Sequence, residues 1–171
     1  MIKIVDIKEL DLRVTWTLLY LGFCDNSIYG GQLLADDIIK YAMSQIEENN
    51  CADMVCELAG TYTSEKEDIC NILNSLMEEE GKDKVIEGRK IRAVFVSNVL
   101  KFKNDNYING LMDLSDLWIG VGYPDDCPHI FQGRNNAVNV KDYYSESNYD
   151  LLFNRHMMWL KDEVKYLKEH Q

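Results

Sequence analysis

Apolar residues recur at spacings of three and four along most of the chain, which is the period of an amphipathic α-helix. Glycine, asparagine and proline residues, which tend to end helices, separate the periodic stretches. The first eight residues instead show some alternation, so we expect them to form a short strand or a lead-in to the first helix. The pattern predicts helices at residues 10–23, 32–48, 52–59, 64–80, 89–103, 107–121 and 147–169.

Six or seven helices with almost no strand pattern predict an all-α fold. Helices that are joined by short turns pack as antiparallel neighbours, which favours a bundle or a stacked helical-hairpin array. A chain of 171 residues is long enough to bury a sizeable core. We therefore expect a single all-helical domain over residues 1–171.

Local signals place several helix ends in the first half of the chain. Ser64, followed three residues later by Glu67, has the pattern of a capping box and predicts that a helix starts there. Three glutamates at residues 78–80 stand at the end of that helix, where the helix dipole disfavours anions by a few tenths of a kcal/mol each. Gly81 and Gly88 flank a polar stretch, which we interpret as a connection to the next helix.

Both prolines of the chain stand in one stretch, residues 123–136. Proline lacks a backbone N–H and restricts the residue before it, so Pro124 and Pro128 are expected to stop the preceding helix. Apolar residues such as Phe131 accompany the turn-forming ones, which predicts an ordered loop near residues 123–142 that is held against the core. We assign a structural role in this loop to Trp118, Pro124, Asp125, Pro128, His129 and Phe131.

The acidic residues are concentrated in the first half of the chain. Residues 1–87 carry 18 acidic and 7 basic side chains, whereas residues 88–171 carry 11 of each, so the net charge of −11 lies in the first half. Such a surface repels nucleic acid and attracts a basic protein, so we expect a protein partner and no direct DNA or RNA binding. A solvated face that only keeps the protein soluble is the alternative interpretation. The candidate partner-binding residues are Asp36, Asp37, Glu47, Glu48, Glu65, Glu67, Asp68, Glu78, Glu79 and Glu80.

The cysteine content and the absence of targeting patterns indicate the compartment. No apolar run approaches the roughly 18 residues of a membrane span, and the first residues do not form a signal peptide. We therefore expect a cytoplasmic protein with no membrane partner. The five cysteines are unevenly spaced and form no CxxC motif, so they are interpreted as mostly buried small apolar residues.

Residues 125–134 are the part of the chain most able to carry chemistry. Cys127 and His129, with a carboxylate such as Asp125, could bind a metal or form a nucleophilic pair, and Arg134 lies nearby in sequence. Their spacing matches no zinc motif, so a structural role in the loop is favoured. His156 lies on the apolar side of the last helix and is expected to be a hydrogen-bonded core histidine.

The chain contains none of the common catalytic, nucleotide-binding or calcium-binding motifs. We therefore predict no catalytic residue, no cofactor and no metal, and we do not expect an enzyme.

Five segments spread over most of the chain carry a resemblance to known proteins. They are LLYLG at residues 18–22, IIKYAMSQIEE at 38–48, CELAGTYTSEKEDICNILNSL at 56–76, LSDLWIGVGYPDDCP at 114–128 and NYDLLFNRHMMWLKDE at 148–163. With them the chain resembles small bacterial all-helical proteins that include immunity proteins of polymorphic and contact-dependent growth inhibition toxins. The resemblance implies that the activity is binding, because an immunity protein covers the active site or substrate surface of its toxin. Such toxins are often nucleases with basic clefts.

The leading hypothesis is therefore an immunity protein that neutralises a cognate toxin domain, possibly a nuclease. A helical adaptor or scaffold for a basic protein partner is the second hypothesis. A hydrolase that uses the loop at residues 125–134 is the third. The sequence makes no prediction about a homo-oligomer.

Overall fold

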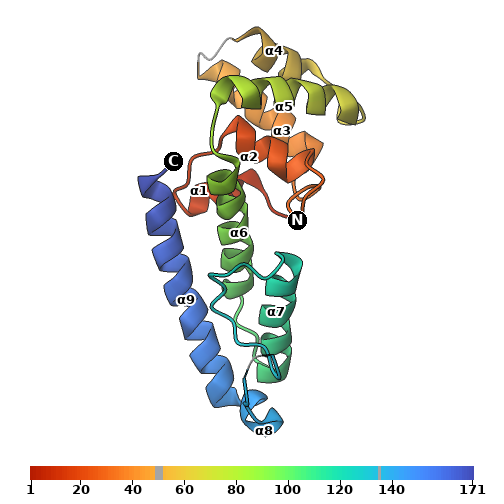
Figure 1. Cartoon of the computed structure of the whole chain (residues 1–171). Helices are drawn as coiled ribbons and strands as arrows, with labels where there is room; N and C mark the ends of the chain where they lie inside the picture. The colour runs from red at the N-terminus through yellow and green to blue at the C-terminus, as the bar shows by residue number, and fades with distance from the viewer. Residues whose placement is uncertain (49–51, 135) are drawn as a thin grey trace. The chain divides into compact units, whose positions relative to one another are not determined.

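The computed structural model describes residues 1–48, 52–134 and 136–171. These residues form helices and no strand, so the predicted all-α class is confirmed (Figure 1). The helices of the described residues are α1 (Ile4–Glu9), α2 (Trp16–Phe23), α3 (Ala35–Glu47), α4 (Asp53–Gly60), α5 (Lys66–Glu80), α6 (Lys84–Leu100), α7 (Tyr107–Gly120), α8 (Val140–Tyr143) and α9 (Glu146–Glu169). Among them none is both long and apolar enough to cross a membrane.

The prediction of six or seven helices is too low because two short helices were missed. The strand or lead-in expected at residues 1–8 is instead α1, whose first turn is closed by the backbone N–H of Lys3, which donates to Asp6 Oδ2 at 2.9 Å. The four-residue helix α8 interrupts the predicted loop, and Asn139 caps it by accepting the N–H of Lys141 at 2.8 Å. Helices α1 and α8 each contain fewer than two turns, so the sequence cannot show an amphipathic pattern that repeats within them.

Two local signals for helix ends do not act as predicted. The expected capping box does not form, because α5 begins at Lys66 and its N-cap residue Glu65 accepts the N–H of Tyr62 at 2.8 Å instead. Helix α6 begins at Lys84, so Gly88 lies inside it. A Cβ atom at Gly88 would stand 2.8 Å from the ring of Tyr29, so this glycine serves close packing and does not break the helix.

The chain divides into two compact units, Met1–Ile91 with Leu167–Gln171 and Arg92–Tyr166. The single domain expected over residues 1–171 remains a prediction.

The first unit is built around α2 and α5, which pack against each other, while α4 contacts both α3 and α5. Leu18 and Leu19 of α2 and Ile69 and Leu73 of α5 are fully buried. A disulfide joins Cys24, which directly follows α2, to Cys70, which lies within α5. The interpretation of the cysteines as mostly buried small apolar residues is therefore wrong for this pair, which is half-buried and disulfide-bonded, and also for Cys56, which is exposed. Cys127 is half-buried, and Cys51 lies outside the described residues.

A buried ion pair holds the start of α6 to the segment before α2. The Lys90 ammonium, which is fully buried, donates to Glu87 Oε1 at 2.9 Å and to the carbonyl of Arg13 at 3.1 Å. Glu87 Oε2 accepts the hydroxyl of Thr15 at 2.7 Å. Each buried charge thus has hydrogen-bond partners, as burial of ions requires.

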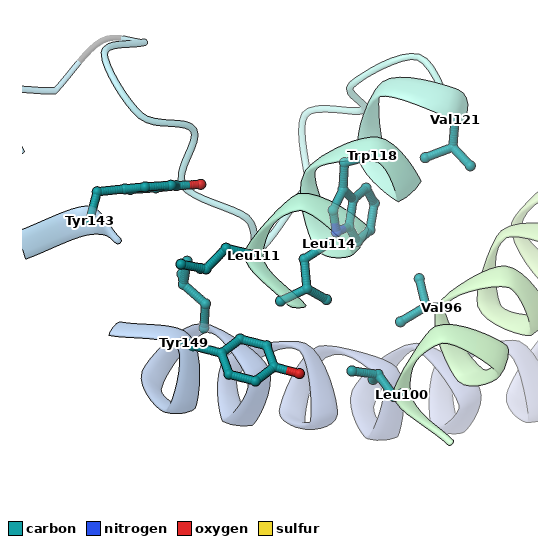
Figure 2. Packing of buried hydrophobic residues seen from close by; sticks show 9 residues of the cluster. Val96, Leu100, Leu111, Leu114, Trp118, Val121, Tyr143 and Tyr149 are labelled. Carbon is teal, nitrogen blue, oxygen red and sulfur yellow. The ribbon is translucent and has the colours of Figure 1, made fainter. Parts of the chain in front are cut away.

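The second unit contains a separate apolar cluster between α6, α7, α8 and α9 (Figure 2). Its buried members are Val96, Leu100, Leu111, Leu114, Trp118, Val121, Tyr143, Tyr149 and Leu152. The side chain of Tyr149 lies where a Cβ atom at Gly110 would stand, 2.3 Å from the ring. This glycine therefore allows the Tyr149 ring of α9 to pack directly against the backbone of α7.

Candidate partner-binding surface and the proline loop

The outer face of α5 carries exposed carboxylates and no cation. Glu67 and Glu78 are eleven residues apart, which places them on one line along a helix, and Asp68 and Glu79 form a parallel line. All four are exposed, whereas the opposite side of α5 is buried. The single basic residue of this helix, Lys66, turns away and places its ammonium 5.7 Å from the centre of the Phe23 ring. We call these four residues the α5 acidic face.

The carboxylates of the α5 acidic face form no ion pair among the described residues. Glu78 accepts a hydrogen bond from the amide of Asn74 at 3.2 Å, one turn earlier. Glu67 and Asp68 lie in the first turn, where the helix dipole favours anions. Glu78 and Glu79 lie in the last turn, where it disfavours them, so local helix stability does not account for this pair.

The other six acidic candidates lie in different surroundings. Asp36 pairs with Lys40 at 2.6 Å, and Glu47 is exposed on α3. Asp37 is half-buried, and its Oδ2 atom has no hydrogen-bond partner among the described residues. Glu65 caps the turn at Tyr62, as described above.

Glu48 and Glu80 lie in a cavity of the first unit instead of on an outer face. The structure thus separates the α5 acidic face from six other candidates, of which Asp36, Glu48, Glu65 and Glu80 make local contacts. That any of them binds a partner remains a prediction.

The helix before the proline loop ends through Gly122 and not through a proline. The N–H of Gly122 donates to the carbonyl of Ile119 and the N–H of Tyr123 to that of Trp118, which is the Schellman arrangement. Gly122 has φ 78° and Tyr123 has φ 53°, both in the left-handed region. The prediction that prolines stop this helix is therefore wrong in mechanism, since Pro124 comes after the helix has ended.

A buried histidine of the proline loop, His129, connects the loop to the core of the second unit. His129 Nε2 lies 2.9 Å from Ser115 Oγ and 3.2 Å from the Tyr143 hydroxyl. Ser115 donates its own proton to the carbonyl of Leu111, so it accepts from His129, and we assign the proton to Nε2. His129 Nδ1 has no partner among the described residues. Burial above all, together with the charges of His156 and Arg155, lowers the pKa of His129 to about 3.

Among the other residues assigned to the loop, Trp118 and Pro128 are buried, Pro124 and Phe131 are half-buried, and Asp125 is exposed. Phe131 packs edge-on between the rings of Tyr123 and His129, at 4.7 and 4.6 Å between centroids. The guanidinium of Arg134 lies 4.1 Å from the centre of the Tyr123 ring.

An arginine of α6 also holds the loop, through contacts that sequence reasoning missed. Arg92 donates to both carboxylate oxygens of Asp126, at 2.9 and 2.6 Å, and contacts Glu163 at 3.4 Å. Its guanidinium lies 5.2 Å from the centre of the Trp159 ring. Asp126 and Glu163 are 34 and 71 residues from Arg92, so no sequence period could reveal the cluster.

The geometry does not bring Cys127 and His129 together as a nucleophilic pair. The Cys127 thiol points to the backbone carbonyl of His129, at 4.0 Å, while the imidazole faces Ser115 and Tyr143. Burial raises the pKa of the Cys127 thiol, which disfavours the thiolate. In the described part of the chain, no three His, Cys, Asp or Glu side chains are grouped as metal ligands would be.

Comparison with known proteins gives one match. Residues 4–164 match the family model DUF2247, described as an uncharacterized protein conserved in bacteria. No curated protein and no solved structure matches the chain.

Proposed function

The chain belongs to the bacterial family DUF2247, and we propose that it acts as an immunity protein that binds a cognate toxin domain and neutralises it. In this proposal the protein works in the cytoplasm and covers the active or substrate-binding surface of the toxin. The activity is stoichiometric binding and needs no catalytic residue.

The observation that carries the proposal is the α5 acidic face. Glu67, Asp68, Glu78 and Glu79 project from one helix without any cation among them, and the last two oppose the dipole of their own helix. Unpaired like charges on one face cost stability, and a surface of opposite charge on a partner offsets that cost. The partner expected from this face is a protein with a basic surface, such as the substrate cleft of a nuclease.

A helical adaptor that binds a basic protein without neutralising it remains the alternative. It shares the α5 acidic face but predicts no effect on toxicity. A hydrolase on the loop is less well supported, because Cys127 and His129 do not face each other.

The test uses the product of the neighbouring gene as the candidate toxin. We expect co-expression of the chain to restore growth of cells that express this product, and the two purified proteins to form a tight complex. Protection without measurable binding would argue against neutralisation by occlusion. Binding without protection would favour the adaptor.

A charge variant locates the contact surface. Glu78→Gln with Glu79→Gln should slow association several-fold at low salt and leave dissociation nearly unchanged, because exposed charges at the rim of an interface act mainly on the association rate. The matched control is Asp142→Asn with Glu146→Gln, two exposed carboxylates outside α5. Equal effects of the two double variants would show that the α5 acidic face is not the contact surface.

A further inference from the structure

A cavity of about 410 Å³ opens to solvent in the first unit. It is lined by α1, the segment that follows it, the start of α2, helix α3 with Glu48 at its end, and the C-terminal end of α5, which all belong to the same unit. Its volume falls in the range of small-molecule sites, about 300–1,000 Å³. The side chains that give it chemical character are Lys8, Arg13, Trp16, Tyr41, Glu48 and Glu80.

The cavity combines two cations with two anions. Lys8 and Arg13 are exposed and form no ion pair with a described carboxylate. Glu80 is held in place, because its Oε2 atom accepts both the backbone N–H and the hydroxyl of Thr17 at 2.9 Å. Glu48 Oε2 accepts the amide of Gln45 at 3.0 Å. The formal charge of these four groups sums to zero, yet the opposite charges do not pair with each other.

Two aromatic rings, those of Trp16 and Tyr41, line the cavity beside the charged groups, and the Lys8 ammonium lies 5.9 Å from the centre of the Tyr41 ring. Trp16 and Tyr41 pack edge-on with ring centres 5.3 Å apart, and the Tyr41 hydroxyl donates to the carbonyl of Val14 at 3.2 Å. Burial above all, together with Glu80 and Glu48 and against the opposing effect of Arg13, raises the pKa of Tyr41 to about 12. The phenol therefore stays neutral at physiological pH, and three of the four charged groups act on it.

We propose that this cavity binds a zwitterion of amino-acid size, a free α-amino acid, with its carboxylate at Arg13 and Lys8 and its ammonium group at Glu48 and Glu80. A zwitterion satisfies both signs of charge, whereas a simple anion or cation leaves one pair of ions without a partner. This inference does not depend on the proposed function, because none of the lining residues belongs to the α5 acidic face.

The first test adds each of the twenty L-amino acids to the full chain and measures the melting temperature of the protein. Binding of those that raise the melting temperature is then measured by titration calorimetry. Ligands that bind only the folded state raise the melting temperature by mass action. We expect at least one amino acid to bind. Its N-acetyl derivative, which lacks the cation, and its amide, which lacks the anion, should each bind about tenfold or more weakly, as expected for loss of a charge-assisted hydrogen bond. Absence of binding by all twenty, or equal binding of the derivatives, would overturn the proposal.

The second test places the ligand in the cavity. Arg13→Gln and Glu48→Gln should each weaken binding of the tightest amino acid by about tenfold or more. Neither change removes a buried side-chain contact, because both side chains are exposed and Arg13 accepts from Lys90 through its backbone. Lys66→Gln and Glu79→Gln are matched controls outside the cavity and should leave the affinity unchanged. Variants at Arg13 and Glu48 that bind like the controls would show that this cavity is not the site.

Discussion

Trp118 donates its indole N–H to His156 Nε2 at 2.7 Å, and both side chains are fully buried. His156 Nδ1 lies 2.6 Å from the carbonyl of Leu152, one turn earlier in α9. Since Nε2 accepts, Nδ1 must donate, and the neutral imidazole then uses both nitrogens. This agrees with the expected core histidine. A protonated ring would lose the bond from Trp118, because Nε2 could no longer accept.

The two buried histidines predict that stability falls in mild acid. Burial lowers the pKa of His156 to about 4 and that of His129 to about 3, from an ordinary value of 6.5. Between pH 6.5 and about 4 the unfolded state therefore binds more protons than the folded state, so the free energy of unfolding decreases as pH falls. Each histidine contributes up to about 1.4 kcal/mol per pH unit in this window.

Urea denaturation from pH 4.5 to 7.5 measures this slope. His129→Gln keeps a hydrogen-bonding side chain and should remove about half of the slope that the histidines produce. A slope that is unchanged in this variant would contradict the assignment. Above about pH 8 the variant and the unsubstituted protein should show the same pH dependence, because the histidines are then almost fully neutral in both states.

Phe131→Ala should destabilise the second unit by about 1.5–2.5 kcal/mol, roughly half of what a fully buried phenylalanine loses. The ring is half-buried, since it packs against Tyr123 and His129 while part of it stays exposed. Thermal or urea unfolding measures the loss. A loss below about 0.5 kcal/mol, the usual range of surface substitutions, would show that the loop does not depend on this contact.

Gly110→Ala should cost about 1–3 kcal/mol or more, because overpacking forces neighbouring groups to move. The added methyl group would lie 2.3 Å from Cζ of Tyr149, and the Tyr149 hydroxyl also accepts the N–H of Asn104 at 3.0 Å. Gly120→Ala in the same helix is the matched control, because no atom lies within 4 Å of the added group. If both substitutions change the unfolding free energy equally, the Tyr149 ring does not pack against the backbone of Gly110 as the structure shows.

The sequence predicts the longer helices well because each has several turns of amphipathic period. Helices α3, α5, α7 and α9 begin and end within three residues of their predicted bounds. The start of α2 was predicted six residues too early and that of α6 five residues too late. At these positions the residues that usually mark a helix end have another role. Gly88, for example, makes room for Tyr29, 59 residues away, and a contact of that kind leaves no local pattern.

The candidate sites were less predictable for the same reason. Counting charges identified an acidic region, but only the fold shows that Glu78 and Glu79 face outward while Glu80 turns toward Thr17 of α2. The cations of the cavity, Lys8 and Arg13, were not recognised as site residues, because their relation to Glu48 depends on the packing of α3.

The disulfide between Cys24 and Cys70 predicts that the oxidised protein is more stable than the reduced one. Closing a loop with a sequence separation of 46 residues is worth about 4 kcal/mol in the chain-entropy estimate. Urea unfolding with and without a phosphine reductant should show a loss of this order. A Cys24→Ser, Cys70→Ser variant should be insensitive to the reductant. The bond also bears on location, because disulfides are rare in a reducing cytoplasm.

Alkylation of the protein in intact cells, followed by peptide mapping, decides whether the bond exists there. If it does, Cys56, which is exposed, should react while Cys24 and Cys70 stay protected until a reductant is added. Equal labelling of all three residues in cells, with protection appearing only after purification in air, would show that the native state is the dithiol. The stability measured with reductant would then be the relevant one in the cell.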